Sequence, residues 1–341
     1  MNITVTSFYM PPVDRIGAGM QMHMLANAYV RLGHTVSVIA PNAQHFEEAQ
    51  YSLRSIDIRA SNRLIRWANF LASIKFEPGM VHFGGDNHFV ARTANVTRLR
   101  TFHGSCFAEC KVARNSRERI RMAYLGFTEL IGQLNCDVST VVSADTNRYF
   151  PKPNVVIPNG INLSSFVPGM EKSRNPSILF VGMLDSRKRG RELLNVFDKQ
   201  IRTRIPNAEL WIVRDSTPVN VPGVTVFGSV SQDLLIHLYQ SAWCFCLPSL
   251  YEGFGVPYIE AMACGTPVVA SPNPGALEVT KDGQYGLIAN LPNLGDELIR
   301  LLDDRDLQKH MSDLALDYVQ RFDIDKVAQR YLDLAKDTGR L

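Results

Sequence analysis

The sequence has few cysteines, no long hydrophobic run and little net charge. Its 341 residues include 6 cysteines, a density too low for the disulfide framework of a small secreted domain. No apolar run approaches the roughly 20 residues that a membrane-spanning helix needs. A net charge of +3 is too small to indicate a partner made of nucleic acid. The hydrophobic fraction of 45% and the charged fraction of 20% are typical of a folded, water-soluble chain.

Signals for export and for metal binding are also missing. Residues 1–12 (MNITVTSFYMPP) have neither a basic n-region nor an apolar h-region, so we expect no signal peptide and a cytoplasmic protein. Cys106 and Cys110 with the nearby His103 give only three ligands, fewer than structural zinc takes. We therefore expect these side chains to pack normally, with no metal and no bound cofactor.

The excess of positive charge lies in residues 1–150 and is concentrated in two clusters. A basic helix with an aromatic face can lie on an anionic membrane surface. In that case this chain would be a peripheral protein at the inner face of the membrane. We favour the simpler interpretation that the apolar stripe of the first cluster faces the protein's own core, and keep membrane contact as the alternative. The first cluster is Arg59, Arg63, Arg66 and Lys75, interleaved with Leu64, Ile65, Trp67, Phe70 and Leu71; the second is Lys111, Arg114, Arg117, Arg119 and Arg121.

Strand and helix patterns alternate in both halves of the chain. Residues 2–9 and 35–40 have strand character, and residues 21–32 between them have helical periodicity, which makes a βαβ unit and predicts a parallel sheet. A segment rich in Asn, Ser, Gly and Pro, residues 159–175, then separates the halves. The pattern restarts at residues 177–181 and continues to residue 288. We expect an α/β protein of two Rossmann-like domains facing across a cleft: residues 1–160, residues 174–320, and a last helix in 321–341 that packs back toward the first domain.

The stretch PSLYEGFGVPYIEAMACGTPVVAS, residues 248–271, has the strongest functional pattern. Gly253 and Gly255 lie in a loop, and a helix follows with Pro257 in its first turn. The free N–H groups at a helix start bind anions, and glycines let a diphosphate approach the backbone. Glu252 and Glu260 add carboxylates that can accept hydrogen bonds from sugar hydroxyls. The segment therefore predicts a site for a phosphorylated sugar compound.

This segment closely resembles the Glu-x7-Glu signature of retaining glycosyltransferases with the GT-B fold, in particular glycosyltransferase family 4. The resemblance implies that Glu252 contacts the transferred sugar and that Glu260 holds the ribose hydroxyls. It also implies that backbone amides near Phe254, Gly255 and Val256 contact the sugar or the phosphates of the donor.

The resemblance extends over nearly the whole chain. ILFVGMLDSRKRGRELL, residues 178–194, is similar to the family's strand–loop–helix with an Arg/Lys pair on the diphosphate, here Arg187 and Lys188. Fixed cations are needed there because negative charge grows on the leaving diphosphate. This chain has Met183 where the family often has Arg. A solvated basic turn is the alternative interpretation of the run from Arg187 to Arg191.

Two loops of the first half also resemble family loops. RIGAG, residues 15–19, is similar to the Gly-rich loop that approaches the donor phosphates, which places Gly17 and Gly19 in the donor site. TFHGS, residues 101–105, resembles the loop whose histidine, here His103, hydrogen-bonds the sugar. A histidine with a purely structural role is the alternative for His103.

The nucleobase contacts are the least defined part of the resemblance. VFGSV, residues 226–230, looks like the family's base-binding turn and implies contacts from Val226, Gly228 and Val230. The family often has a Gly-rich turn at residues 213–215, where this chain has Arg214 and Asp215.

The resemblance implies a retaining, metal-independent hexosyltransferase that moves a sugar from a UDP- or GDP-sugar to a hydroxyl group of a glycan, a lipid-linked or a small-molecule acceptor, in glycoconjugate synthesis. A non-catalytic protein that binds nucleotide sugars and a UDP-sugar 2-epimerase of the same fold are the alternatives. A dinucleotide dehydrogenase is excluded, because no G-x-G-x-x-G opens a helix with an acid about 20 residues further on.

Overall fold

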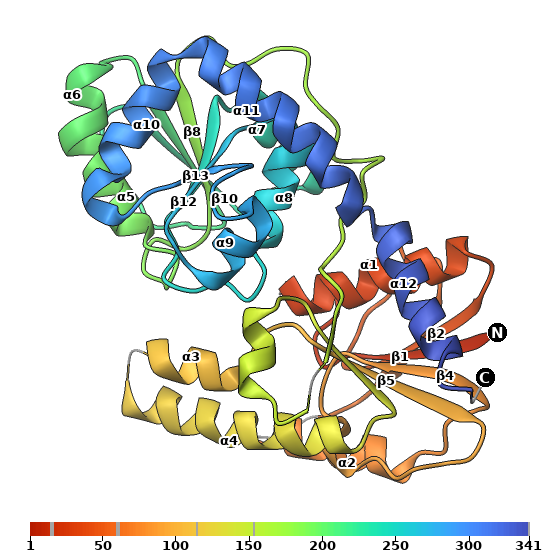
Figure 1. Cartoon of the computed structure of the whole chain (residues 1–341). Coiled ribbons are helices and arrows are strands. Elements are labelled where there is room, and N and C mark those ends of the chain that lie inside the picture. The colour runs from red at the N-terminus through yellow and green to blue at the C-terminus, as the bar shows by residue number, and fades with distance from the viewer. Residues whose placement is uncertain (14–16, 59–61, 114, 153, 340–341) are drawn as a thin grey trace. The chain divides into compact units, whose positions relative to one another are not determined.

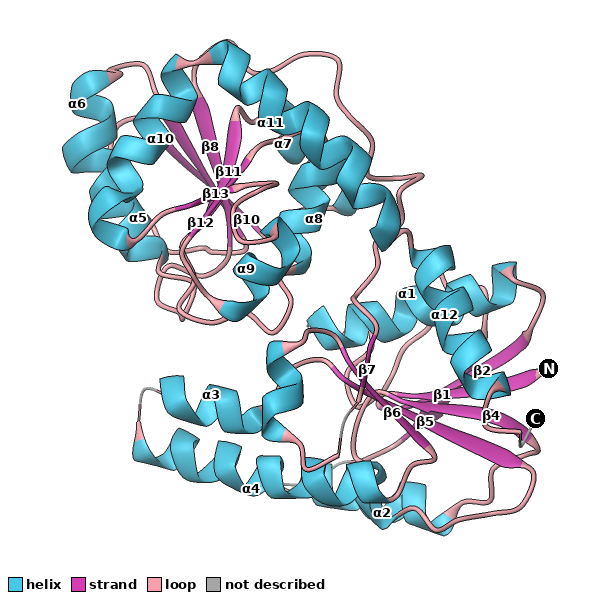
Figure 2. Ribbon diagram, in the orientation of Figure 1, coloured by secondary structure: helices cyan, strands magenta, loops and turns pink. Residues whose placement is uncertain are grey.

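The structure, a computed structural model, describes residues 1–13, 17–58, 62–113, 115–152 and 154–339, and it divides into two compact units. Unit 1 comprises Met1–Gly160 and Phe322–Leu341, and unit 2 comprises Ile161–Arg321. Each unit has a parallel sheet with helices on both faces (Figures 1 and 2). This architecture confirms the predicted fold of two Rossmann-like α/β domains.

The sheet of unit 1 has seven strands in the order β3-β2-β1-β4-β5-β6-β7, and its strand pairs are parallel. The strands are β1 (Asn2–Thr6), β2 (Thr35–Pro41), β3 (Ser52–Ile56), β4 (Gly79–Phe83), β5 (Val96–Phe102), β6 (Val138–Val141) and β7 (Val155–Val156). The helices are α1 (Gly17–Arg31), α2 (Arg63–Ser73), α3 (Cys106–Val112), α4 (Ser116–Leu134) and α12 (Ile324–Lys336), with the short 3-10 helices η1 (Asn87–Phe89) and η2 (Asp145–Tyr149).

Two apolar cores cover the two faces of this sheet. On one face, α1 and α12 pack together against β1 and β2, with Tyr29 and Tyr331 fully buried. On the other face, α2 buries Trp67 and Leu71 against β4. The chain therefore returns to unit 1 at its end, and α12 is a component of that unit's core.

Strand β5 carries two buried arginines, which an apolar core strand does not normally contain. Arg98 forms a two-point ion pair with Asp137, with Nη2–Oδ1 at 2.8 Å and Nε–Oδ2 at 3.1 Å. Arg100 donates to the Asn87 amide oxygen at 3.3 Å and lies over the Phe102 ring. The ion pair with Asp137 offsets the desolvation cost of Arg98. Arg100 has a neutral partner, and burial lowers its pKa.

The sheet of unit 2 has six strands in the order β10-β9-β8-β11-β12-β13, again in parallel pairs. The strands are β8 (Ser177–Val181), β9 (Glu209–Val213), β10 (Val224–Gly228), β11 (Cys244–Leu247), β12 (Val268–Ala270) and β13 (Leu287–Ile288). The helices are α5 (Gly190–Val196), α6 (Arg202–Arg204), α7 (Gln232–Ser241), α8 (Val256–Ala263), α9 (Pro274–Thr280), α10 (Leu294–Asp303) and α11 (Arg305–Tyr318), with the shorter η3 (Phe197–Ile201), η4 (Leu291–Asn293) and η5 (Val319–Phe322).

The structure corrects two local predictions, the first of them at the start of α1. The sequence predicted a loop for residues 15–19, but α1 already begins at Gly17, and Arg15 and Ile16 lie outside the described residues. Gly19 is needed inside the helix because a Cβ there would lie 2.5 Å from the carbonyl oxygen of Tyr9. The close approach of α1 to the β1–α1 connection therefore explains one of the two glycines without any ligand.

The helix predicted at residues 191–201 also differs in detail. It is α5 followed by η3, a π-helical turn, since the hydrogen bonds there skip one extra residue. Among the described residues, no helix is both long enough and apolar enough to cross a lipid bilayer.

Candidate functional site

Three loops of unit 2 meet where the carboxyl ends of its strands lie. The N–H of Leu250, after β11, donates to the carbonyl oxygen of Arg187, after β8, at 2.8 Å. Asp215, after β9, accepts a hydrogen bond from the N–H of Leu184 in the same β8 loop. In open α/β sheets this edge is where ligands bind, so backbone contacts assemble the loops that carry the predicted site residues.

Glu252 is held in place by two polar partners. Arg187 Nη2 lies 3.3 Å from Glu252 Oε2, and the Ser249 hydroxyl donates to Oε1 at 2.8 Å. Arg187 Nε also donates to the Tyr251 carbonyl oxygen at 3.0 Å. The Glu252 side chain is only 9% exposed, while the Arg187 side chain is 41% exposed. Each carboxylate oxygen can accept a second hydrogen bond, so this geometry leaves Glu252 able to bind a hydroxyl.

Lys188 lies close enough to Glu252 and Arg187 for their charges to interact. Its ammonium donates to the Val181 carbonyl oxygen at 2.9 Å, at the end of β8. Its aliphatic stem crosses Gly182, where a Cβ would lie 2.5 Å from Lys188 Cδ. Burial lowers the pKa of Lys188, and the charge of Glu252 opposes this by raising it. Arg187 and Lys188 together place two cations at the ends of β8 and β11.

The start of α8 presents backbone rather than side chains. Gly255 precedes the helix with φ +93°, a conformation that favours glycine, and a Cβ there would collide with the Tyr258 ring at 2.4 Å. Val256 is the first helical residue, and the side chain of Phe254 is buried. Pro257 has no N–H group, and the Tyr258 N–H donates to the Gly255 carbonyl oxygen at 3.0 Å. The Val256 N–H is therefore the first-turn donor without a partner inside the helix, and a free N–H at a helix start can bind an anion.

Helix α9 contacts the loop that carries Glu252 and Phe254. The N–H of Gly275 donates to the Glu252 carbonyl oxygen at 3.0 Å. A Cβ at Gly275 would lie 2.7 Å from the carbonyl oxygens of both Glu252 and Phe254. The sequence did not predict this contact, because nothing near Gly275 indicates which loop it touches.

Glu260 is positioned by a residue that the sequence did not indicate. The Tyr239 hydroxyl, from α7, donates to Glu260 Oε2 at 2.9 Å. Burial raises the pKa of Glu260, and the Tyr239 hydrogen bond and the charges of Arg214 and Lys188 oppose that rise. Arg214 therefore belongs to the electrostatic surroundings of the site, although it departs from the family pattern.

The residues expected at the nucleobase lie on β10 and just after it. Val226, Gly228 and Val230 are half-buried, and Gly228 has φ +66°. The Arg214 N–H donates to the Gly228 carbonyl oxygen at 2.6 Å, with Arg214 itself at φ +69°. Arg214 thus takes the left-handed conformation that a glycine adopts easily.

The carboxylate of Asp215 has a structural role in unit 2. Besides the Leu184 N–H, its carboxylate accepts the Thr217 N–H at 2.8 Å. Burial alone would raise the pKa of Asp215, but these hydrogen bonds outweigh it and the pKa is lowered. The aspartate fixes the loop after β8 with respect to β9.

The remaining predicted residues belong to unit 1. His103 follows β5, and its Nδ1 lies 3.3 Å from the Asn159 amide oxygen. Its Nε2 is buried without a hydrogen-bond partner among the described residues. Burial lowers the pKa of His103 to about 4, although the Asn159 hydrogen bond acts in the opposite direction. Apart from its chain neighbours, no described residue has an atom within 4 Å of a Cβ built on Gly17.

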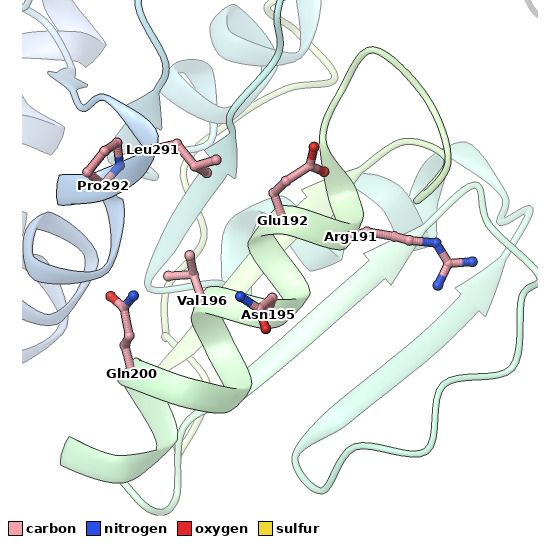
Figure 3. A pocket seen from close by; sticks show the side chains of 7 residues that line it. All are labelled: Arg191, Glu192, Asn195, Val196, Gln200, Leu291 and Pro292. Atoms are coloured by element: carbon pink, nitrogen blue, oxygen red, sulfur yellow. The ribbon is translucent and has the colours of Figure 1, made fainter.

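A shallow pocket of about 410 Å³ lies along α5, and none of the predicted donor residues lines it. In Figure 3 the side chain of Arg191 points away from Leu291 and Pro292, and Arg191 is paired with Asp185. The described residues contain no group of three or more His, Cys, Asp or Glu side chains that could hold a metal ion. The pocket is lined by Arg191, Glu192, Asn195, Val196, Gln200, Leu291 and Pro292.

Comparisons with known proteins agree with this geometry. Residues 16–165 match the model described as "Glycosyltransferase Family 4", and residues 175–304 match the model described as "Glycosyl transferases group 1". An uncharacterized glycosyltransferase of Methanocaldococcus jannaschii is 27% identical over 98% of both chains. A phosphatidyl-myo-inositol mannosyltransferase of Mycolicibacterium smegmatis is 24% identical over 93% of this chain and 89% of its own.

Solved structures share the fold over the whole length. Sucrose-phosphate synthase from Thermosynechococcus elongatus is similar with a TM-score of 0.80 and 22% identity, covering 99% of this chain and 98% of its own. Anabaena HepE, solved with UDP and glucose, has a TM-score of 0.75 and 16% identity, covering 98% of this chain and 99% of its own.

Proposed function

Because the chain belongs to glycosyltransferase family 4, we propose that it transfers a sugar from a nucleoside diphosphate sugar to a hydroxyl group, with retention at the anomeric carbon and without a metal ion. The observation that carries this proposal is the cluster of Arg187 and Lys188 beside Glu252 at the strand ends of unit 2. Two fixed cations next to a buried carboxylate suit a substrate that is anionic at one end and rich in hydroxyls at the other.

The cations act on the leaving group. When the glycosyl bond breaks, negative charge develops on the diphosphate, and Arg187 and Lys188 stabilise it together with the Val256 N–H group at the start of α8. Such preorganised donors serve the purpose that a metal ion serves elsewhere. The leaving phosphate takes the proton of the incoming hydroxyl, so the protein positions the reactants and needs no second carboxylate as a base.

The carboxylates act on the sugar and the ribose. Glu252, fixed by Arg187 and Ser249, accepts hydrogen bonds from the transferred sugar. Glu260, fixed by Tyr239, accepts them from the ribose hydroxyls. His103, neutral at pH 7 because of its lowered pKa, hydrogen-bonds the donor sugar. The start of α1 at Gly17 and Gly19 admits the phosphates.

The relatives support a choice of donor nucleotide and of acceptor class. HepE was solved with UDP, so we place UDP before GDP as the donor nucleotide. The Mycolicibacterium relative is named for a mannosyl transfer to a phosphatidylinositol, which favours a lipid-linked acceptor. Peripheral contact with an anionic membrane surface belongs to the same proposal.

Nucleotide release from a panel of donors tests the proposal. The protein is incubated with UDP-, GDP- and ADP-sugars in the presence of EDTA, and the free nucleoside diphosphate is measured. We expect release from one nucleotide class, undiminished by EDTA, with the newly formed sugar anomer matching that of the donor by NMR. Thermal stabilisation by a nucleotide sugar without release indicates a binding protein, and sugar interconversion without release indicates an epimerase. Either result contradicts the proposal, and loss of turnover with EDTA contradicts its metal-free part.

A further inference from the structure

The outer face of α4 carries a continuous row of large apolar side chains in contact with solvent. Ile120 is 71% exposed, Tyr124 53%, Phe127 62%, Ile131 43% and Leu134 48%. Their separations alternate between four and three residues, which keeps all five on one face of the helix. A folded protein rarely leaves so long an apolar strip in water unless something covers it.

Within the row, the Phe127 ring packs edge-on against Phe107 of α3, with centroids 5.5 Å apart, and is still 62% exposed. The main face by which α4 joins its own unit is a different one. The opposite side buries Met122 and Gly126. A Cβ at Gly126 would lie 2.8 Å from the Phe107 ring of α3, and one at Gly132 would lie 2.7 Å from the Asn87 side chain. Helix α4 is therefore already seated by small residues, next to α3 (Figure 1), and the apolar row is additional to what packing requires.

Helix α2 shows the contrast within the same unit. It also combines basic and apolar residues, but it turns Trp67 and Leu71 into the core, where both are fully buried. For α2 the apolar stripe is explained by the fold. For α4 it is not.

The charges around the row are almost all positive. Arg117, Arg119 and Arg121 are exposed, and none forms an ion pair with a residue that the structure describes. Arg117 lies three residues before Ile120 and so continues the row by one turn. Within α4 the only exposed acid is Glu118. Cations near a helix N-terminus are unfavourable for the helix itself, so intrahelical stability does not account for them.

We propose that the outer face of α4 docks unit 1 on the anionic surface of a lipid membrane. The apolar row enters the boundary between headgroups and acyl chains, Tyr124 and Phe127 lie at the depth that aromatic side chains prefer, and the three arginines meet lipid phosphates. A second copy of the chain is a poorer occupant, because α4 offers only Glu118 to neutralise three arginines on the opposing helix. The proposal names the element responsible for the membrane contact and does not depend on the donor chemistry.

Vesicle sedimentation of the full-length protein tests the docking. Vesicles of phosphatidylcholine are compared with vesicles that also contain phosphatidylglycerol. We expect the wild type to pellet with the anionic vesicles, and less at high salt. R117Q/R119Q/R121Q should reduce partitioning on the order of a hundredfold, since each basic residue near such a surface contributes about a fivefold factor. I120S/Y124S should reduce it at least tenfold.

A matched pair on α2 provides the control. Ile65 and Arg66 are exposed on that basic helix, and I65S/R66Q should bind vesicles as the wild type does. Circular dichroism melting and nucleotide release in solution should be unchanged in all variants, which separates loss of docking from misfolding and from failure of the proposed enzymatic function. Three outcomes overturn the proposal: no binding by the wild type, equal binding by the wild type and both α4 variants, or a dimer by light scattering that I120S/Y124S dissociates.

Discussion

At the scale of single residues, the two cations after β8 have different structural environments. Arg187 is anchored to the loop after β11 by Glu252 and the Tyr251 carbonyl, so it also organises that loop. Lys188 contacts Val181 in its own segment, so removing its charge disturbs less of the structure. The two residues can therefore be separated experimentally.

Lys188→Ala should lower turnover on the order of a hundredfold, because one fixed cation at a developing charge contributes about 3 kcal/mol. Arg187→Ala should lower turnover at least tenfold as well. Arg191→Ala, which removes a nearby exposed cation paired with Asp185, serves as the control and should change turnover little. Kinetics and thermal melting are measured together, and near-normal turnover in both the Arg187 and the Lys188 variants would exclude the phosphate contacts.

The protonation of His103 can be measured directly. Burial lowers its pKa to about 4, so we expect a neutral imidazole throughout the range from pH 7 to pH 5. Because the unfolded chain has an ordinary histidine pKa, it binds a proton that the folded state does not, and this site reduces stability as the pH falls from about 6.5 to about 4. Nitrogen-15 NMR, assigned with a His103→Gln variant, reads the protonation state. A titration centred near pH 6.5 would show that the ring is not buried as described.

Asp215→Asn should destabilise the protein by about 1–3 kcal/mol near neutral pH, since a carboxylate that accepts two backbone N–H groups is replaced by a weaker acceptor. The pKa of Asp215 is lowered, so its stabilising contribution is present above the unfolded pKa and is lost as the pH falls through the folded one. Urea unfolding at a series of pH values checks this. A gap between variant and wild type that does not narrow toward low pH would contradict it.

At the scale of elements, helix starts and the glycines beside them carry most of the candidate site. Gly19, Gly255 and Gly275 each meet neighbouring atoms that leave no room for a side chain. Gly17 differs, because it begins α1 and a Cβ there would meet no described residue within 4 Å apart from its chain neighbours. The described part of unit 1 therefore offers no packing explanation for its lack of a side chain.

This difference makes Gly17→Ala a test of ligand approach at α1. Alanine favours a helix over glycine by about 0.5–1 kcal/mol, so stability should be equal or slightly higher. Turnover should fall at least tenfold if the donor phosphates approach this backbone, since a methyl group would then occupy the space they need. Unchanged kinetics in a stable variant would remove Gly17 from the site.

At the scale of the whole molecule, the order along the chain and the division into units do not coincide. Unit 1 is closed by α12, which comes from the far end of the sequence and buries Tyr331 beside the His82 ring, with centroids 4.8 Å apart. The ion pair of Arg31 with Asp325 links α1 to α12 at the surface. The stability of unit 1 thus depends on residues that follow unit 2.

A chain ending at Arg321 should lose protection in unit 1 alone. Removing α12 uncovers several buried apolar side chains, each worth about 1.5–3 kcal/mol when buried, against a total stability of about 5–15 kcal/mol. Hydrogen exchange followed by mass spectrometry should show faster exchange in β1 and β4 and little change in β8 and β11. Equal protection of unit 1 with and without α12 would contradict its role in the core.

The sequence by itself determined the fold class and the residues that define the family, because these depend on local patterns. Alternating strand and helix periods specify parallel sheets, and the spacing of Glu252, Gly255 and Glu260 lies within one loop and one helix, where neighbours in sequence are neighbours in space. The same reasoning placed Arg187 and Lys188 at a strand end.

Only the tertiary structure decided which distant groups hold these residues, and which apolar stripes are buried. Tyr239 reaches Glu260, and Asp215 fixes the β8 loop, through contacts between segments far apart in the chain, which no local pattern specifies. The stripes of α2 and α4 look alike in sequence, since hydrophobic periodicity gives a helix an apolar face without saying what that face meets. The fold places Trp67 in a core and leaves Phe127 in solvent.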